Sequence, residues 1–265
     1  MFLGNLRGRF AMSRRLLAGF IVLLSVLSCL AVLQVSGQAA PAKIKVLIVT
    51  GHDVLPAHDW RKTTPKVREI LDETGRFDVR VCEDVGIFES STLGNYDVIV
   101  LNFGFWEAPD PSPAAKAGLL KYVESGKGLA AFHFACASYQ DWAEYQKLLG
   151  RVWKKGVGGH GPRGKFMVKI EKKDHPITAG IPDFEMDDEL YAKLSGDEPI
   201  EVLATAFSAD FSKKVEPLVF TKSYGKGRVV QQLFGHDTRV QENPNYKIIV
   251  ARCVEWAATG TVAAK

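Results

Sequence analysis

Short apolar runs alternate with amphipathic segments along the first half of the chain. Runs with the continuous apolar character of strands buried on both faces of a sheet lie at residues 44–50, 77–82, 96–103 and 128–133. Segments with the helical spacing of apolar residues follow three of these runs, at residues 65–74, 112–124 and 138–149. This alternation predicts an α/β fold, a doubly wound and mostly parallel sheet with helices on both faces.

The second half of the chain has a less regular pattern. A glycine-rich loop is expected over residues 150–164, and a long loop with several prolines over residues 174–199. Further strands are expected at residues 165–170, 202–207, 217–221 and 228–234, with a hairpin turn at residues 224–227 and a final amphipathic helix at residues 243–258. Because no repeat or low-complexity linker follows residue 42, we expect a single domain over residues 40–265.

Five of the six histidines lie where a predicted strand ends or in the glycine- and proline-rich loop that follows it. They are His52, His58, His133, His160 and His236. An open parallel sheet binds its ligands in the crevice beyond the carboxyl ends of the strands. Imidazole is the side chain best suited to proton transfer near neutral pH, and it is also a common metal ligand. We therefore expect these imidazoles to converge at that edge of the sheet.

Carboxylates and aromatic rings accompany these histidines. Asp53 and Asp237 each follow a histidine directly and are placed to orient it. Glu189 belongs to an acidic loop that is most simply solvated. Because an apolar residue follows it, the side chain of Glu189 could instead turn into the cleft. Trp60 and Trp106 suit stacking on a sugar ring, although packing in the core explains them equally well.

The sequence leaves the cofactor open. Its histidines show no compact motif such as H-E-x-x-H, so spacing alone defines no metal site. Several imidazoles together with Glu189, Asp53 and Asp237 would suit zinc or a similar divalent ion. The alternative is a metal-free cluster of imidazoles that binds sugar hydroxyls through hydrogen bonds.

The first 39 residues have the layout of a secretory signal peptide. Four arginines precede an apolar run at residues 16–35, and small residues that suit cleavage lead up to Ala39. The apolar run approaches the ~20 residues of a membrane span, so an uncleaved membrane anchor is the alternative. We expect the domain at residues 40–265 to be exported to the periplasm or the extracellular space.

The net positive charge of the chain belongs to this first segment. Residues 1–39 hold four arginines and no acidic residue, so 30 basic residues balance 30 acidic ones in the rest of the chain. A neutral domain gives no electrostatic basis for binding nucleic acid.

Cys136 lies three residues after His133, in a strand-to-turn-to-helix context that displays nucleophiles in hydrolases. A Cys-dependent amidase is therefore an alternative function, although a small buried cysteine is the simpler interpretation. The motif G-x-G-x-x-G at residues 156–161 follows a helix and precedes a strand, which is the reverse of the context of a dinucleotide-binding loop.

The order and spacing of several short motifs resemble the ThuA-like (trehalose utilisation) family over residues 43–258. These motifs are Gly126–Leu129 with Phe132–His133, then Gly159–His160, His175–Thr178, Asp188–Tyr191, Tyr224–Arg228 and Gly235–Asp237. The resemblance implies the flavodoxin-like sheet of class I glutamine amidotransferases and a role with disaccharides or their 3-keto derivatives. This chain has His133 at the amidotransferase nucleophile position, so glutaminase chemistry is not carried over.

We therefore expect an exported enzyme of carbohydrate catabolism that acts on a small-molecule sugar or keto-sugar, in a chain that could form a homo-oligomer. His133 and His236 are expected at the centre of catalysis, with Glu189 completing the catalytic set. The substrate is expected to contact the other rim residues, namely His52, Asp53, His58, Trp60, Trp106, His160 and Asp237. A carbohydrate-binding accessory protein without turnover would use the same rim and is the main alternative.

Overall fold

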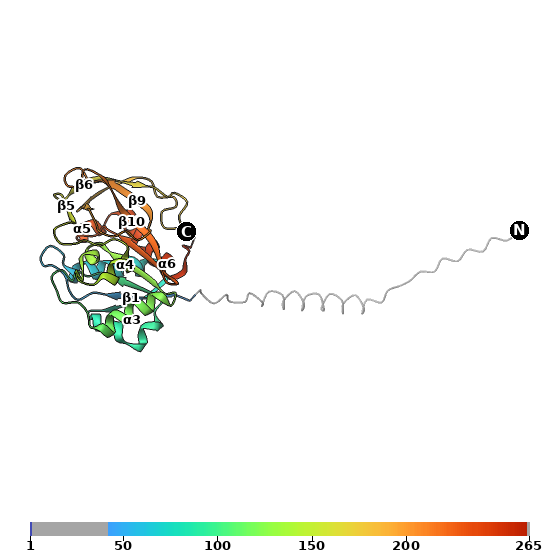
Figure 1. The fold of residues 1–265 in the computed structure, drawn as a ribbon. Helices are drawn as coiled ribbons and strands as arrows, with labels where there is room; N and C mark the ends of the chain where they lie inside the picture. Colours follow the sequence, from blue (N-terminus) through green and yellow to red (C-terminus); the bar gives the residue numbers. More distant parts are fainter. Residues whose placement is uncertain (2–41, 264–265) are drawn as a thin grey trace. The chain divides into compact units, whose positions relative to one another are not determined.

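The computed structural model describes Met1 and residues 42–263 (Figure 1). Apart from Met1, the predicted signal peptide at residues 1–39 lies outside the described residues. The chain divides into two units, Met1–Ala42 and Lys43–Lys265, and the fold is that of the second unit. Among the described residues, no helix is long and apolar enough to cross a membrane.

Five parallel strands form the part of the sheet that the sequence predicted. They are β1 (Ile44–Val49), β2 (Phe77–Cys82), β3 (Val98–Leu101), β4 (Gly128–Phe132) and β11 (Gly227–Gln232). Their order in the sheet is β2-β1-β3-β4-β11, and every neighbouring pair is parallel. This is the strand order of a flavodoxin-like doubly wound sheet, so the predicted fold class is confirmed.

The continuous apolar character of these strands follows from burial on both faces, as β1 illustrates. Val46 and Ile48 pack into the core on one face of the sheet, whereas Leu47 and Val49 pack into a second core on the other face. Successive side chains of a strand point to opposite faces, so all four are buried only if both faces are covered.

Helices provide this cover. The larger ones are α2 (Trp60–Glu73), α3 (Pro113–Glu124), α4 (Ala143–Leu149) and α6 (Pro244–Thr259). Helices α2 and α6 contribute to one core, and α3 and α4 contribute to the other. Shorter helices are α5 (Thr238–Gln241) and the 3-10 helices η1 (Val85–Glu89), η2 (Ser91–Asn95) and η3 (His133–Ala137).

Two helices begin at other residues than the sequence predicted. Helix α2 begins at Trp60 rather than at residue 65, because Asp59 caps it and Pro65 is accommodated inside the helix. This earlier start turns Trp60 into the buried face of the helix. Helix α4 begins at Ala143 rather than at residue 138, since Tyr139 adopts a left-handed conformation (φ 56°) that a helix cannot include.

Four antiparallel strands extend the same sheet, which has nine strands within the described residues. They follow β11 in the order β10 (Val215–Tyr224), β9 (Glu201–Phe207), β6 (Gly164–Ile170) and β7 (Phe184–Asp188). Strands β6, β9 and β10 gather at the end of the domain opposite β1 and α3 (Figure 1). A separate two-stranded sheet joins β5 (Gly159–His160) to β8 (Tyr191–Ala192).

Three of these strands occur where the sequence predicted loops. Strands β7 and β8 lie within residues 174–199, and β5 lies within the glycine-rich residues 150–164. In β7, Phe184, Met186 and Asp188 are buried while the residues between them are exposed. The strand was missed because a buried aspartate stands at the third inward position and breaks the apolar alternation.

Candidate functional site

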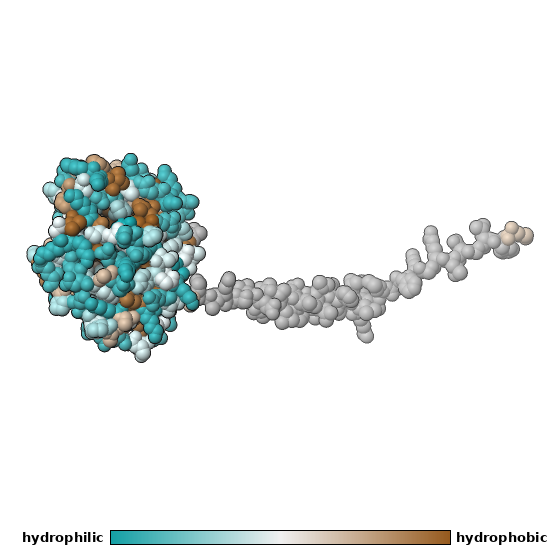
Figure 2. Space-filling view, viewed as in Figure 1, coloured by the Kyte–Doolittle hydropathy of each residue, from teal (hydrophilic) through white to brown (hydrophobic). Residues whose placement is uncertain are grey.

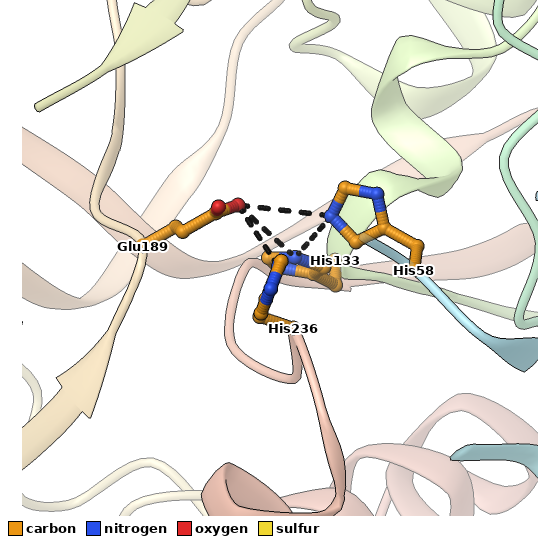
Figure 3. Close-up of side chains that lie close together, drawn as sticks. All are labelled: His58, His133, Glu189 and His236. Carbon is orange, nitrogen blue, oxygen red and sulfur yellow. Dashed lines mark hydrogen bonds and ion pairs between the residues drawn. The ribbon is translucent and has the colours of Figure 1, made fainter. Parts of the chain in front are cut away.

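Four side chains converge beyond the carboxyl ends of the parallel strands (Figure 3). His58 lies in the link between β1 and α2, His133 directly follows β4, and His236 follows β11. Glu189 comes from the antiparallel half, between β7 and β8. One ligand atom of each residue lies within 4.8 Å of those of the other three. We refer to these four residues as the His–Glu cluster.

Local backbone geometry turns two of the histidines toward the cluster. His133 has a φ of 44°, a left-handed conformation that is strained for a residue with a side chain. Gly235, with a φ of 121°, allows the sharp turn before His236. The carboxylate of Asp188 accepts hydrogen bonds from the amides of Gly235 (2.8 Å) and His236 (3.4 Å). These bonds tie the turn after β11 to the end of β7.

The carboxylate of Glu189 is surrounded by imidazoles. Its Oε2 lies 3.1 Å from Nδ1 of His236, 3.7 Å from Nε2 of His58 and 4.0 Å from Nε2 of His133. Its Oε1 lies 3.7 Å from Nε2 of His160. The side chain of Glu189 is 13% exposed and that of His160 is 32% exposed, so the cluster opens to solvent on the side of His160.

The hydrogen bonds of His133 determine which of its ring nitrogens carries the proton. Its Nδ1 lies 2.9 Å from the carbonyl oxygen of Leu233, which can only accept, so Nδ1 carries the proton in the neutral ring. Its Nε2 then presents a lone pair to the hydroxyl of Tyr191 at 2.8 Å. Nε2 of His58 lies 3.2 Å from both that hydroxyl and Nε2 of His133. Tyr191 therefore joins the two buried imidazoles.

Asp53 stands behind His58. Its Oδ1 accepts a hydrogen bond from the amide of Val54 and lies 3.8 Å from Nδ1 of His58. The chain leaves room for this carboxylate at Gly104, where a Cβ atom would lie 2.3 Å from Oδ1 of Asp53 and 2.5 Å from the ring of Phe134. Burial raises the pKa of Asp53 to about 7, so this carboxyl is only weakly acidic.

The surroundings of the cluster favour neutral rings at two of its histidines and charged forms at the other two residues. Burial lowers the pKa of His58 and of His133, which favours their neutral rings. Burial also opposes the charged forms of His236 and Glu189. The charge of each residue favours the charged form of the other, and this attraction outweighs the effect of burial. The pKa of His236 is therefore raised, and that of Glu189 lies well below its usual range. Neutral bases thus lie beside an ion pair, a set suited to proton transfer.

Several residues expected at the rim contribute in other ways. Nδ1 of His52 donates a hydrogen bond to the carbonyl oxygen of Gly104 (2.9 Å), and its ring stacks on Phe105. Trp60 is buried in α2 and 8% exposed, so the core-packing alternative describes it. Among the described residues, neither belongs to the His–Glu cluster.

Asp237 supports the backbone rather than the ring of His236. Its carboxylate caps α5 and pairs with Arg163 (2.6 Å) and Arg239 (2.8 Å). Burial would raise the pKa of Asp237, but these two guanidinium groups hold it at about 2. Asp237 therefore remains charged and engaged with arginines, while Asp188 holds the backbone amide of His236.

Tyr191 and Asp188 are site residues that the sequence reasoning missed. Both belong to the segment that was interpreted as a solvated acidic loop, and both are fully buried. Burial raises the pKa of Asp188 to about 7 and that of Tyr191 well above its usual value. The apolar residues at alternate positions before Asp188 were the available signal, because they continue the inward face of β7 to the cluster.

An aromatic wall, Trp106, Trp153 and Phe134, stands beside the cluster. The ring centre of Trp153 lies 5.6 Å from the ring centre of His160 and 6.1 Å from that of Trp106. The ring of Phe134 lies 5.9 Å from that of Trp106 and stacks on His58 at 4.3 Å. Trp106 thus belongs to the wall beside the cluster, its contact with a substrate stays a prediction, and Trp153 was not anticipated.

Two cavities border this region. One, of about 640 Å³, lies between β6 and β9 and is lined in part by Gly161, Asp188 and Leu190, which are chain neighbours of His160 and Glu189. The three histidines of the cluster line a second cavity of about 10 Å³, roughly the space of one water molecule. A ligand of sugar size must therefore approach the cluster from its open side.

Cys136 is unsuited to nucleophilic catalysis. It is fully buried in η3, and burial raises the pKa of its thiol to about 12. The thiolate is the reactive form of cysteine, so a buried neutral thiol is inert near pH 7. The structure therefore favours the simpler interpretation of Cys136 as a core residue.

The fold and the cluster define a flavodoxin-like protein with a histidine-rich site at the carboxyl edge of its sheet. Residues 45–257 match the profile of the ThuA family, described as trehalose utilisation, and the chain belongs to this family. A ThuA-like protein from Parabacteroides merdae ATCC 43184 has a similar structure, with a TM-score of 0.75 and 26% identity over 84% of this chain and 92% of that chain. The resemblance predicted from the motifs is confirmed.

Other solved structures share the fold. A ThuA-like protein from Bacteroides uniformis ATCC 8492 has a TM-score of 0.68 and 19% identity, over 85% of this chain and 97% of that chain. A cold-adapted beta-galactosidase from Rahnella sp. R3 has a TM-score of 0.53 and 14% identity, over 82% of this chain and 32% of that chain. No match was found among curated proteins. Family membership supports a carbohydrate-related role.

Proposed function

We propose that this protein is an enzyme of carbohydrate catabolism that acts on disaccharides or their 3-keto derivatives through acid–base chemistry at the His–Glu cluster. The observation that carries the proposal is the convergence of His58, His133 and His236 on the partly buried carboxylate of Glu189. Such a set offers a proton acceptor, a proton donor and an electrophile within one small volume. Membership of the trehalose utilisation family supports a sugar as the substrate.

The chemistry that suits this cluster is elimination at the glycosidic bond. A 3-keto group acidifies the neighbouring C2–H, and a base of the cluster takes that proton while an electrophile stabilises the enediolate. The C1–O bond then breaks, and the leaving oxygen takes a proton to give a free sugar and an unsaturated keto-sugar. Addition of water to the latter completes a net hydrolysis. In the protein alone, the imidazolium of His236 is the electrophile, since Glu189 favours its charged form.

The aromatic wall supports sugar binding. Trp106 and Trp153 are half-buried and lie side by side, and Trp153 lies next to His160, on the open side of the cluster. The apolar face of a sugar ring packs well on an indole, which leaves the sugar hydroxyls free for polar partners. We therefore place the sugar between this wall and the His–Glu cluster.

The test is incubation of the purified protein with 3-ketotrehalose and, in parallel, with trehalose, followed by measurement of released glucose. Glucose release from either sugar that disappears in His236→Gln supports the proposal. Equal release by wild type and by this variant, or no release from these and related 3-keto-glycosides, contradicts it. Trp106→Ala should raise KM about 3- to 10-fold with a smaller change in kcat, whereas Trp60→Phe, inside α2, should leave KM unchanged.

The aromatic wall also keeps a binding protein without turnover as the second candidate. A binder should lose affinity in His236→Gln in proportion to one lost contact, whereas an enzyme should lose rate far more than binding.

We further propose that the protein acts outside the cytoplasm, because its first 39 residues have the layout of a signal peptide. Mass spectrometry of the protein from its native host should then find an N-terminus near Ala40, or residues 1–39 intact in the membrane fraction if they form an anchor. Cytoplasmic protein with residues 1–39 intact contradicts export.

A further inference from the structure

Several buried polar atoms of the His–Glu cluster lack a hydrogen-bond partner within the described part of the chain. They are Oε2 of Glu189, Nδ1 of His236 and Nδ1 of His58. The first two lie 3.1 Å apart, yet they are not aligned for a hydrogen bond. Buried polar atoms without partners are rare in proteins because each costs free energy to desolvate. Oε2 of Glu189 and Nδ1 of His236 therefore point to a missing partner inside the cluster that satisfies both, whereas Nδ1 of His58 faces Asp53.

Four of the six separations between the donor atoms are those of ligands around one metal ion, and all six lie within 4.8 Å. A zinc ion about 2.0–2.2 Å from each ligand holds neighbouring nitrogen and oxygen ligands roughly 3–4 Å apart. In the cluster, Nδ1 of His236 lies 3.1 Å from Oε2 of Glu189, and the Nε2 atoms of His58 and His133 are 3.2 Å apart. The carboxylate oxygen is 3.7 and 4.0 Å from those two Nε2 atoms.

Groups outside the cluster orient two of its imidazoles in the way that metal-binding histidines are oriented in other proteins. The carbonyl of Leu233 keeps the proton of His133 on Nδ1, which leaves the lone pair of Nε2 directed at the cluster. The carboxyl group of Asp53 faces Nδ1 of His58 at 3.8 Å, on the side away from the cluster. A carboxylate or carbonyl behind the ring is the usual second partner of a ligating histidine.

We propose that His58, His133, His236 and Glu189 together bind one divalent transition-metal ion, zinc or an ion of similar ligand preference. Three imidazoles and a single carboxylate suit such an ion, whereas calcium and magnesium require mostly oxygen ligands. The ion takes the lone pair of His133 Nε2, so the hydroxyl of Tyr191 turns its proton elsewhere. The role of the ion rests on the proposed function, in which it replaces the imidazolium of His236 as the electrophile for the keto oxygen.

The chain offers matched variants for a test. Glu189→Gln and His236→Ala each remove one ligand of the cluster. Glu185→Gln changes an exposed glutamate of β7 that pairs with Lys165, and His175→Ala removes a histidine that packs on Trp256. Neither control residue belongs to the cluster.

The experiment measures metal directly, in protein produced without a histidine tag. Elemental analysis of the protein as purified is followed by calorimetric titration of chelator-treated protein with Zn²⁺, and by the visible absorption of Co²⁺ as a spectroscopic probe. We expect one equivalent of metal in the wild type and in both controls. Glu189→Gln and His236→Ala should bind about 10- to 100-fold more weakly, with circular dichroism showing the same fold.

Two results would overturn the metal proposal. One is folded wild-type protein that takes up less than about a tenth of an equivalent of Zn²⁺ or Co²⁺ at micromolar excess. The other is equal binding by the wild type and both ligand variants. The proposed function fails separately, since a protein that binds metal but releases no glucose from 3-keto-glycosides contradicts the function alone. Full activity in metal-free protein contradicts only the role of the ion as the electrophile.

Discussion

The parallel and antiparallel halves of the sheet contribute different chemistry to the cluster. The parallel half supplies three imidazoles, His58, His133 and His236, each in the link after a strand buried on both faces. The carboxylate of Glu189 follows β7 of the antiparallel half, and the hydroxyl of Tyr191 comes from β8 of the adjoining two-stranded sheet. A rigid parallel scaffold thus positions the bases, and an extension from the other half adds the charge that favours the protonation of His236.

The largest effect is expected from removing the contribution of the antiparallel half. Glu189→Gln should lower kcat/KM for the sugar substrate about 10²- to 10⁴-fold, since the cluster loses its only carboxylate and the charge that favours the imidazolium of His236. Initial rates of glucose release measure this loss. Glu185→Gln, an exposed change on the same strand, should retain the wild-type rate. Equal activity in both variants would remove Glu189 from the mechanism.

The parallel half can be tested through its core. Ile48→Ala, fully buried in β1, should lower the free energy of unfolding by about 2–5 kcal/mol because it leaves a cavity between the sheet and α2. Phe207→Ala, 55% exposed at the end of β9, should change it by less than about 0.5 kcal/mol. Urea unfolding followed by circular dichroism compares the two. A similar cost at both positions would show that the antiparallel half is as tightly packed as the parallel half.

A smaller effect is expected where the scaffold meets the cluster. Gly104→Ala places a methyl group against Asp53 and Phe134, so it should cost about 1–3 kcal/mol of stability and shift the support of His58. Activity should fall by about tenfold or more through this displacement. Gly94→Ala, in η2, has no atom near the added methyl group and serves as the control. If the two variants behave alike, Asp53 does not position His58.

The smallest effect is expected at Cys136. The raised pKa of its thiol, about 12, keeps the group protonated and unreactive through pH 7–9. Cys136→Ser should therefore retain most of the activity, and iodoacetamide should label this residue in the folded protein only when the pH approaches 12 or the protein unfolds. Peptide mass spectrometry after alkylation measures the labelling. Rapid modification at pH 8 together with loss of activity would instead support the Cys-dependent amidase.

The sequence by itself determined the parallel half of the fold and the region of the site. Strands covered on both faces must be apolar at every position, so β1, β3 and β4 are visible as continuous runs. Parallel strands share one carboxyl edge, so histidines that follow such runs are brought near one another wherever the strands are neighbours. This reasoning placed His133 and His236 correctly at one edge, together with Glu189 as a possible partner.

Only the tertiary structure decided which side chains meet. The direction of a side chain beyond a strand end depends on turns and on hydrogen bonds to distant residues, such as Nδ1 of His133 to Leu233 or Asp188 to the amide of Gly235. These contacts join positions 100 and 47 residues apart, which no local pattern encodes. For the same reason His52 is bonded to a backbone carbonyl, and Tyr191 contacts His133 of the cluster from a segment too polar to resemble a strand.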